Sequence, residues 1–304
     1  MEKRSIGSLK VSVVGIGCNN FGWRIDAANT AKVVDAALDA GINFFDTADI
    51  YAKGESETFL GKALGPRRNQ IVLATKFGLP MDDERKGAKP AYIKRAIEDS
   101  LHRLNTDHID LYQLHKPDPA TPIADTLAAL DELVKAGKVR EIGCSNFSAD
   151  QIREAESAVK SGAAKFVSVQ NEYSLLNRAP EADVLPACLH AKMGFIPYFP
   201  LANGLLTGKY RKGQPLPQGT RGADGFGPKV FTEENLNKVE ALIQFATTHG
   251  HTMLELAISW LAAQPAVASV IAGAKTPEQA HANAGAASWK LSPDQLRTVD
   301  QLLS

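Results

Sequence analysis

The segment INFFDTADIY, residues 42–51, joins a short apolar run to an aspartate at position 46 and a tyrosine at position 51. The run has the β-branched and aromatic composition of a buried strand, whereas a short loop has little need of either polar side chain. Seven other runs of this kind occur along the chain, at 11–17, 71–75, 109–115, 139–145, 166–170, 194–199 and 268–273. The number and spacing of these runs decide the fold class.

The eight apolar runs alternate with helical patterns, and near-continuous apolar strands between helices are typical of a parallel sheet covered by helices. Eight such units in 304 residues match the size of a (β/α)8 barrel, or TIM barrel. The alternative, a doubly wound open sheet, usually has a GxGxxG fingerprint after its first strand. Here Asn20 stands where the third glycine would be, after Gly15 and Gly17. We therefore predict an α/β protein with a single (β/α)8 barrel domain over residues 1–304.

Two segments outside the eight units have their own expected roles. The residues before Val11, with a turn at Gly7-Ser8, are expected to form an N-terminal β-hairpin that covers the base of the barrel. The interval after the seventh run is much longer than one crossover, and residues 203–228 contain seven glycines and three prolines. This composition favours irregular backbone. Because it follows a barrel strand, we expect a long glycine-rich loop that covers a ligand at the catalytic end.

Several helix starts are also marked in the sequence. Ser148, Thr276 and Ser292 are each followed three residues later by glutamine, the pattern of a capping box. Thr121-Pro122 precedes an apolar-periodic segment that ends at Gly137, so we expect Thr121 to be the N-cap and Pro122 to lie in the first turn.

The composition argues against some partners and sites. The chain has 34 basic and 34 acidic residues and a formal net charge of zero, so no basic surplus is present to bind nucleic acid or an anionic membrane. No apolar run approaches the roughly 20 residues of a membrane span, and the N-terminal segment lacks a signal-peptide pattern. The three cysteines are far apart and have no metal-ligand spacing. We expect a cytoplasmic protein without a bound metal.

Polar side chains lie at the ends of most predicted strands. In a (β/α)8 barrel the loops after the strands hold the active site, and its residues come from several strand ends. Asp46, Lys76 and His115 lie at the ends of the second, third and fourth runs, and Tyr51 is close enough in sequence to fold back over the barrel mouth. The polar residues at the later strand ends are Ser145, Asn146, Gln170, Asn171 and Tyr198.

Each of the first four residues has a purely structural explanation when it is taken alone. Asp46 could cap a turn, Lys76 could simply pair with it, and His115 or Tyr51 could pack at the rim. Together they make a general acid. Tyrosine has a reference pKa of about 10, a neighbouring ammonium favours the phenolate, and a carboxylate holds that ammonium in place. With a histidine to orient a carbonyl oxygen, the set fits reduction of a carbonyl to an alcohol.

These strand ends belong to seven longer motifs, which follow one another over most of the chain: FFDTADIY, ATKFG, YQLHKPD, GCSNF, VQNEYS, YFPLANGLLTGKY and IAGAKTPEQAHANAGA. The motifs resemble those of the aldo-keto reductase superfamily. They are most similar to the branch that contains bacterial general reductases, sugar dehydrogenases and potassium-channel β subunits. Seven ordered motifs are far more specific than any one of them.

The resemblance implies that Tyr51 is the proton donor, that Lys76 and Asp46 tune it, and that His115 orients the substrate carbonyl. It also implies a nicotinamide cofactor bound without a Rossmann fold, with Tyr51 and His115 at the substrate. Separately, of the aromatic residues near strand-end or C-terminal loops (Phe21, Trp23, Phe77 and Trp289) we expect Trp23 to contact the substrate. The implied cofactor contacts are Cys18, Asn19, Asp46, Ser145, Asn146, Gln170, Tyr198, Phe199, Pro200, Leu201, Asn203, Lys209, Arg221, Gly273, Lys275, Gln279 and Asn283.

The residues at the adenosine end favour NADP(H) over NAD(H). Lys275 directly precedes the expected N-cap Thr276, so an ammonium stands beside a helix N-terminus that already attracts anions. Gln279 and Asn283 lie one helical turn apart and match the family's contacts to the adenosine. Many relatives have arginine in place of Lys275, and arginine makes the more specific phosphate contact. NAD(H) use therefore stays open.

Three functions follow from this reading. The first is an NADP-dependent oxidoreductase that interconverts aldehydes or ketones and alcohols, with a small-molecule substrate and with Tyr51 as the general acid or base. The second is a cofactor-sensing regulatory subunit of the channel β-subunit type, with slow turnover. The third is an unrelated barrel enzyme, an isomerase or aldolase, that uses Lys76 as a Schiff base. The sequence does not distinguish a monomer from a homo-oligomer.

Overall fold

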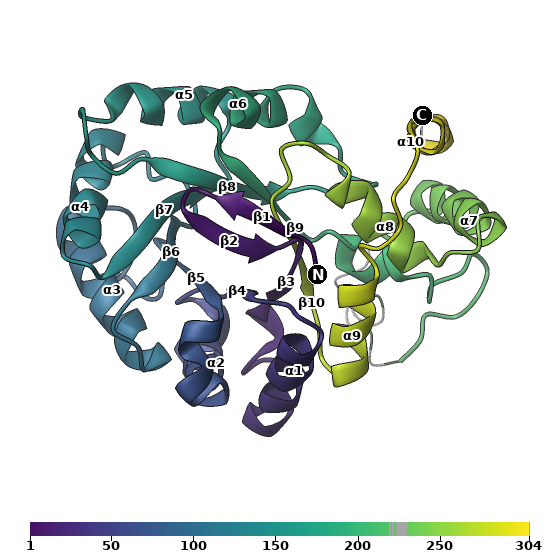
Figure 1. Cartoon of the computed structure of the whole chain (residues 1–304), viewed down its shortest axis with the longest axis horizontal. Helices are drawn as coiled ribbons and strands as arrows, with labels where there is room; N and C mark the ends of the chain where they lie inside the picture. Colours follow the sequence, from purple (N-terminus) through teal and green to yellow (C-terminus); the bar gives the residue numbers. More distant parts are fainter. Residues whose placement is uncertain (219, 221, 223–229, 304) are drawn as a thin grey trace.

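The computed structural model describes residues 1–218, 220, 222 and 230–303, and eight parallel strands form the central sheet of this part of the chain (Figure 1). The strands are β3 (Val14–Gly17), β4 (Phe44–Asp46), β5 (Val72–Phe77), β6 (Ile109–Leu114), β7 (Val139–Ser145), β8 (Phe166–Glu172), β9 (Gly194–Tyr198) and β10 (Val270–Gly273). From β3 to β9 each strand pairs with the next along the chain, and β10 returns to pair with β3.

The two outer strands are β9 and β10, and Phe195 of β9 pairs with the segment just before β10. Its backbone N–H donates to the carbonyl of Ala266 at 2.8 Å, and its carbonyl accepts from the N–H of Ala268 at 2.8 Å. These bonds bring the remaining edges of the sheet together. The sheet is therefore a nearly closed (β/α)8 barrel, as the sequence predicted.

Helices cover the outside of this barrel (Figure 1). They are α1 (Ala27–Asp39), α2 (Glu55–Leu64), α3 (Pro90–Leu104), α4 (Ile123–Lys135), α5 (Ala149–Ala158), α6 (Val184–Ala191), α7 (Glu233–Thr248), α8 (Met253–Ala262), α9 (Pro277–Gly285) and α10 (Pro293–Leu303). Short 3₁₀ turns include η1 (Cys18–Asn20), η2 (Tyr51–Gly54), η3 (Gly65–Gln70), η4 (Ala179–Glu181) and η5 (Ala202–Thr207). Among the described residues, no helix combines the length and apolar character needed to cross a membrane.

The predicted N-terminal hairpin is present and covers one end of the barrel (Figure 1). Strands β1 (Lys3–Ile6) and β2 (Leu9–Ser12) pair antiparallel. Gly7 makes the turn with a φ of 55°, a conformation that favours glycine. The side chains of Ile6 and Leu9 pack inside the barrel against Phe44 and Leu111. The hairpin therefore closes the amino-terminal end of the strands and leaves the opposite end for the site.

The prediction of one continuous strand over residues 11–17 is wrong. Ser12 ends β2, and β3 begins at Val14. The reason is a local exchange with Asn43: the Asn43 side-chain oxygen accepts from the Ser12 N–H at 2.6 Å, and the Ser12 hydroxyl accepts from the Asn43 N–H at 3.0 Å. Since these polar groups satisfy each other at the turn, the chain changes direction within an apolar run that has no turn signal of its own.

Two of the predicted helix starts differ from the structure in detail. Capping boxes are present at Ser148 and at Ser292. Thr276 caps α9, but the Gln279 side chain accepts from the N–H of Lys275 instead of closing the box. Pro122, not Thr121, is the N-cap of α4. The Thr121 hydroxyl donates to Asp118 at 2.8 Å, and this bond replaces the expected cap.

Candidate active site

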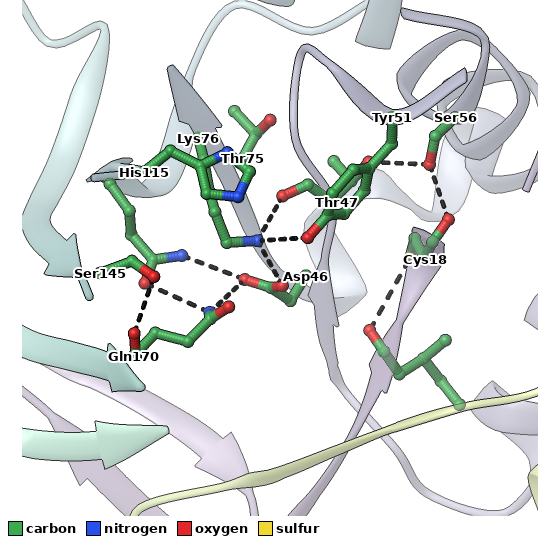
Figure 2. A network of polar contacts seen from close by, with 12 residues as sticks. Cys18, Asp46, Thr47, Tyr51, Ser56, Thr75, Lys76, His115, Ser145 and Gln170 are labelled. Atoms are coloured by element: carbon green, nitrogen blue, oxygen red, sulfur yellow. Dashed lines mark hydrogen bonds and ion pairs between the residues drawn. The ribbon is translucent and has the colours of Figure 1, made fainter. Parts of the chain in front are cut away.

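The carboxyl ends of β4 and β5 bring Asp46 and Lys76 together (Figure 2). The Lys76 ammonium donates to Asp46 Oδ2 at 2.6 Å and to the carbonyl of Thr47 at 2.8 Å. Its third contact is the Tyr51 hydroxyl at 3.5 Å. The Lys76 side chain is fully buried. The loop after β4 thus places the Tyr51 hydroxyl close to the Lys76 ammonium.

The second oxygen of the Asp46 carboxylate is held by two amides. Asp46 Oδ1 accepts from Gln113 Nε2 at 3.0 Å and from Gln170 Nε2 at 2.9 Å. Gln113 lies on β6 and Gln170 on β8, so these bonds cross the barrel interior. The sequence analysis missed Gln113. Its signal is a lone polar residue in an apolar strand, two positions before His115 and so on the same face of the strand.

Burial and charge act in opposite directions on the pKa of Lys76 and of Tyr51. Burial lowers the pKa of Lys76, but the Asp46 carboxylate and Tyr51 raise it, and the net shift is upward. Burial raises the pKa of Tyr51, the Lys76 charge lowers it, and the net shift is also upward. At neutral pH the site therefore holds a lysine ammonium beside a protonated phenol. The ammonium limits the rise in the Tyr51 pKa but does not reverse it.

His115 follows β6 and faces the same group. Its ring centroid lies 5.9 Å from that of Tyr51, edge to face. Burial, together with the Lys76 charge, lowers the pKa of His115 to about 3. The imidazole is therefore neutral at physiological pH, and its Nδ1 has no hydrogen-bond partner among the described residues. A neutral ring can orient a carbonyl oxygen by a hydrogen bond, but it adds no positive charge.

The carboxyl ends of β7, β8 and β9 form a second polar group next to this one. The Ser145 hydroxyl donates to the Gln170 carbonyl at 2.7 Å, and the Asn146 amide donates to the His115 carbonyl at 2.9 Å. The Tyr198 hydroxyl donates to Asn146 Oδ1 at 2.8 Å, which fixes the orientation of its ring. Burial raises the pKa of Tyr198 to about 12. The Tyr198 side chain is therefore a neutral phenol at physiological pH.

One cavity of about 700 Å³ opens over both groups, a volume within the range of about 300–1,000 Å³ typical of small-molecule sites. Most of the residues that the sequence assigned to the site line it. They are Asn19, Asp46, Tyr51, His115, Ser145, Asn146, Gln170, Tyr198, Phe199, Pro200, Leu201, Asn203, Lys209, Gly273, Lys275, Gln279 and Asn283. The segment after β9 contributes many of them, as expected for a loop that covers a ligand.

Three of the predicted residues that the structure describes do not line the cavity. Lys76 is buried next to Tyr51, with its ammonium 3.5 Å from the Tyr51 hydroxyl. Cys18 is buried, and its thiol donates to the Ile16 carbonyl. Trp23 is 51% exposed and is not part of the lining, so its assignment to the substrate stays a prediction. Arg221 lies outside the described residues.

The sequence analysis also missed lining residues near the mouth. They include Asn20, Arg24, Leu79, Lys116, Thr207, Thr220 and Leu254. Lys116 directly follows His115, and Arg24 directly follows Trp23. The sequence offered one signal for these two residues, their position next to an assigned residue. No sequence pattern distinguishes a lysine or arginine that lines a cavity from one on the surface in contact with water.

The other end of the cavity lies at the start of α9. Thr276 is the N-cap of this helix, and Gln279 and Asn283 face the cavity from its first turns. Lys275 stands beside them. A cation next to unsatisfied backbone N–H groups at a helix N-terminus suits a phosphate group. This end of the cavity thus suits an anion, whereas the end with Asp46, Tyr51 and His115 has the groups that a proton transfer needs.

The geometry argues against a Schiff-base role for Lys76. A lysine must be unprotonated to attack a carbonyl, but the Lys76 ammonium makes a 2.6 Å ion pair with Asp46, and its pKa is raised. Because Tyr51 and not Lys76 lines the cavity, the lysine amine does not face a bound ligand. The isomerase or aldolase alternative therefore has no support in this arrangement.

Comparison with known proteins identifies the family of the chain. Residues 13–304 match the model of the Aldo/keto reductase family. Bacillus subtilis proteins named "Uncharacterized oxidoreductase YqkF" and "Aldo-keto reductase YhdN" are 37% and 34% identical to the chain; the alignments cover 98% and 100% of this chain and 95% and 94% of those proteins. A "Probable voltage-gated potassium channel subunit beta" of Arabidopsis thaliana is 34% identical, over 100% of this chain and 97% of that protein.

The fold has a match of the same kind among solved structures. The glycerol dehydrogenase AKR11B4 from Gluconobacter oxydans superposes with a TM-score of 0.86 at 30% sequence identity, over 99% of this chain and 94% of that one. The family model covers nearly the whole chain, and relatives above 30% identity extend from end to end. This chain is therefore an oxidoreductase of the aldo/keto reductase family.

Proposed function

We propose that this protein interconverts aldehydes or ketones and alcohols with a nicotinamide dinucleotide, and that Tyr51 is its general acid and base. The observation that supports this most is the Lys76 ammonium, held 2.6 Å from Asp46 and 3.5 Å from the Tyr51 hydroxyl at the end of a ligand-sized cavity. A bound nicotinamide would supply or accept the hydride.

The cavity residues fit such a cofactor. The hydroxyl and amide groups of Ser145, Asn146 and Gln170 lie beside the oriented ring of Tyr198, which suits a flat carboxamide-bearing ring. Lys209 and Lys275 line the remainder of the cavity, where they would face phosphate groups. We therefore assign the polar groups at the ends of β7, β8 and β9 to the nicotinamide, and the two lysines to the phosphates.

The protein's own task in this reaction is to move one proton. In the reducing direction Tyr51 donates its hydroxyl proton to the carbonyl oxygen, and the phenolate that remains is stabilised by the Lys76 ammonium. Asp46 keeps that ammonium charged and in place. His115, neutral at working pH, orients the same oxygen. In the oxidising direction the phenolate takes the proton back.

A single variant tests the role of Tyr51. Tyr51→Phe removes the proton donor and leaves the ring, so turnover of carbonyl substrates should fall about 100-fold or more while NADPH affinity, measured by fluorescence titration, changes little. Tyr112→Phe is the matched control: Tyr112 lies on β6, and its hydroxyl has no hydrogen-bond partner among the described residues. This control should keep wild-type turnover. Wild-type turnover by Tyr51→Phe would remove Tyr51 from its role.

The preferred cofactor and substrate are part of the same proposal. We favour NADP(H) because Lys275 stands at the N-terminus of α9, and we expect a small-molecule substrate handled in the cytoplasm by residues 1–304 acting as one domain. The primary experiment follows the absorbance of NADPH and NADH with a panel of aldehydes, ketones, quinones and sugars. If no member is turned over with either cofactor, the enzyme proposal fails.

A second function has one specific observation in its favour. The plant relative named as a probable potassium channel subunit β matches the whole chain at 34% identity. A cofactor-sensing regulatory protein would keep Asp46, Tyr51, Lys76 and His115 but turn over slowly. Slow turnover on every carbonyl in the panel, together with specific capture of one partner protein, would favour this function over the first.

A further inference from the structure

We propose that Gln113 is a positioning residue of this site: its side-chain amide donates to Asp46 and thereby makes Tyr51 a stronger acid. Gln113 is fully buried on β6 and is not among the described residues that line the cavity. It would therefore act through Asp46 and not on a ligand. The inference rests on the proposed function, because the acidity of Tyr51 affects turnover only if Tyr51 is the proton donor.

A buried amide at position 113 needs an explanation. Leu111 lies two residues earlier, on the same face of the strand, and packs in an apolar cluster with Phe44 and Ala74. An apolar side chain at position 113 would extend this cluster, whereas a buried amide loses its hydrogen bonds to water. The presence of glutamine is therefore explained by what its amide contacts.

The Gln113 amide is directed at Asp46. In the parallel pair β5–β6, Gln113 lies opposite Lys76, so both side chains extend from the same face of the sheet. Gln113 Nε2 donates to Asp46 Oδ1 at 3.0 Å, and Gln170 Nε2 donates to the same oxygen at 2.9 Å. Because a carboxylate only accepts hydrogen bonds, the N–H end of the Gln113 amide must face Asp46. The positive end of the amide dipole thus points at the carboxylate.

The next strand leaves room for this side chain. Gln113 pairs with Gly143 of β7. A methyl group built on Gly143 would lie only 3.2 Å from Gln113 Cγ and would collide with the Ser168 hydroxyl. The absence of a side chain at Gly143 therefore allows the Gln113 side chain to extend toward Asp46.

The sign of the effect on Tyr51 follows from the charges beside it. Burial raises the pKa of Tyr51 most; the Lys76 ammonium lowers it, and the Asp46 carboxylate raises it. An N–H donated to Asp46 Oδ1 offsets part of the carboxylate charge, so the Gln113 amide reduces the effect of Asp46 on Tyr51. Without this amide, Asp46 would also hold the Lys76 ammonium more tightly. The Tyr51 phenol would then ionise at higher pH.

The other groups around Tyr51 stay in place when Gln113 is replaced. The titratable groups that face Tyr51 in the described part of the chain are Asp46 on β4, Lys76 on β5, His115 after β6, Tyr198 on β9 and Cys18 in η1. Gln113→Met changes none of these groups and removes one N–H donor to Asp46. A change in the ionisation of Tyr51 would therefore report that donor.

The experiment measures the ionisation of Tyr51 directly. The protein is labelled with 3-fluorotyrosine, whose phenol ionises at lower pH than that of tyrosine, and the Tyr51 signal in the fluorine NMR spectrum is the one that Tyr51→Phe lacks. In Gln113→Met the midpoint of this titration should rise by about half to one pH unit. At neutral pH, kcat/KM for reduction of benzaldehyde should fall about three- to tenfold, while NADPH affinity stays within about twofold of wild type.

Ser168→Ala is the matched control. Ser168 lies on β8, is fully buried, and has a hydroxyl without a hydrogen-bond partner among the described residues. Its replacement removes a buried polar atom but no donor to Asp46, so the Tyr51 midpoint should not move. Gln113→Asn is a second test variant: it keeps an amide that is one methylene too short for Asp46, and it should shift the midpoint as Gln113→Met does. Urea unfolding of each variant separates a loss of stability from a shift in ionisation.

The outcomes separate this inference from the proposed function. If Gln113→Met and Gln113→Asn lower stability but leave the Tyr51 midpoint unchanged, Gln113 is only a packing residue; the inference is then wrong while the proposed function stands. If the midpoint rises but wild-type protein reduces no carbonyl compound of the panel with either cofactor, the proposed function is wrong and the positioning role falls with it. An equal shift in Ser168→Ala would also contradict the role of the Gln113 amide.

Discussion

At the scale of single residues, burial sets the protonation state of the site before any ligand binds. Tyr51 is a phenol whose pKa lies above its ordinary value, and His115 is an imidazole whose pKa is about 3. Only Lys76 is a cation, and its charge is balanced by Asp46. Tyr51 therefore keeps its phenol proton in the free site, which is the state that the proposed reducing direction needs.

A second buried carboxyl lies two residues before Tyr51 and predicts a pH effect on stability. Burial, and next the charge of Glu57, raise the pKa of Asp49 to about 7. Tyr92 makes a long contact of 3.5 Å to its Oδ2, and Oδ1 has no hydrogen-bond partner among the described residues. Arg103 is occupied by Glu57 at 2.6 Å. Asp49 is therefore a neutral carboxylic acid in the folded protein below about pH 7.

The sign of the effect follows from linkage. The folded pKa lies above the unfolded value of about 4, so the stability that Asp49 contributes is complete below about pH 4 and is lost as the pH rises to 7. In Asp49→Asn this titration is absent. We expect the free energy of unfolding in urea, wild type minus Asp49→Asn, to decrease from pH 4.5 to 7.5 and then to level off. A difference that is independent of pH would contradict the neutral carboxyl.

Lys275 gives a residue-scale prediction for the cofactor. If its ammonium contacts a 2′-phosphate, Lys275→Met should weaken NADPH binding about 10- to 100-fold, the range for losing a hydrogen bond to a charged group. NADH lacks that phosphate, and its affinity should change much less. Fluorescence titration of both cofactors measures this split. Equal weakening of NADPH and NADH binding would contradict a contact between Lys275 and the 2′-phosphate.

The single-residue features differ in how far the sequence could predict them. Asp46, Lys76 and His115 lie at strand ends, where chain order alone places them in one barrel mouth. The roles of Gln113 and Asp49 depend on cross-barrel hydrogen bonds and on burial, which arise only when the strand register is known.

At the scale of elements, the main polar contact at the carboxyl ends of the strands is the buried ion pair between β4 and β5. Asp46 is the last residue of β4, and Lys76 lies near the end of β5. Their side chains are 2% and 0% exposed. Two charges taken out of water are stable only with good partners, and the amides of Gln113 and Gln170 with the Thr47 carbonyl complete that set. Four strands of the barrel thus meet at one carboxylate.

A double-mutant cycle tests this network. Asp46→Asn and Lys76→Met should each lower the free energy of unfolding by about 3–5 kcal/mol, because each leaves a buried charge without its counterion. The double variant should lose clearly less than the sum, since both charges are gone. Urea unfolding measures stability, and carbonyl turnover should stay lost in all three. Additive losses of stability would show that the pair is not coupled.

Element boundaries were predictable where a pattern continued without interruption. The apolar runs at 139–145 and 166–170 correspond to β7 and β8 within two residues. The break at Val13 was not predictable, because Ser12 is turned by a hydrogen-bond exchange with Asn43, 31 residues away. The start of α4 also differs from the prediction because of a hydrogen bond that the local pattern does not reveal. The Thr121 hydroxyl donates to Asp118 in the preceding loop and so does not cap the helix.

At the scale of the whole molecule, the two ends of the barrel have different tasks. The hairpin β1–β2 lies across one end (Figure 1) and packs Ile6, Leu9 and Val11 into it. The cavity with Tyr51 opens at the other end. In barrels of this kind the carboxyl ends of the strands serve chemistry and the amino ends serve stability. Stability and activity should therefore respond separately to substitutions at the two ends.

Leu9 tests this separation, because its side chain is 1% exposed inside the barrel end. Leu9→Ala should lower the free energy of unfolding by about 2–5 kcal/mol through lost burial and the cavity left behind. NADPH affinity and kcat/KM, measured well below the melting temperature, should stay within about twofold of wild type. Leu189→Ala is the matched control: this leucine is 52% exposed on α6, and its removal should change stability by no more than about 0.5 kcal/mol. A loss of activity in Leu9→Ala under folding conditions would mean that the hairpin end and the catalytic end are coupled through the strands between them.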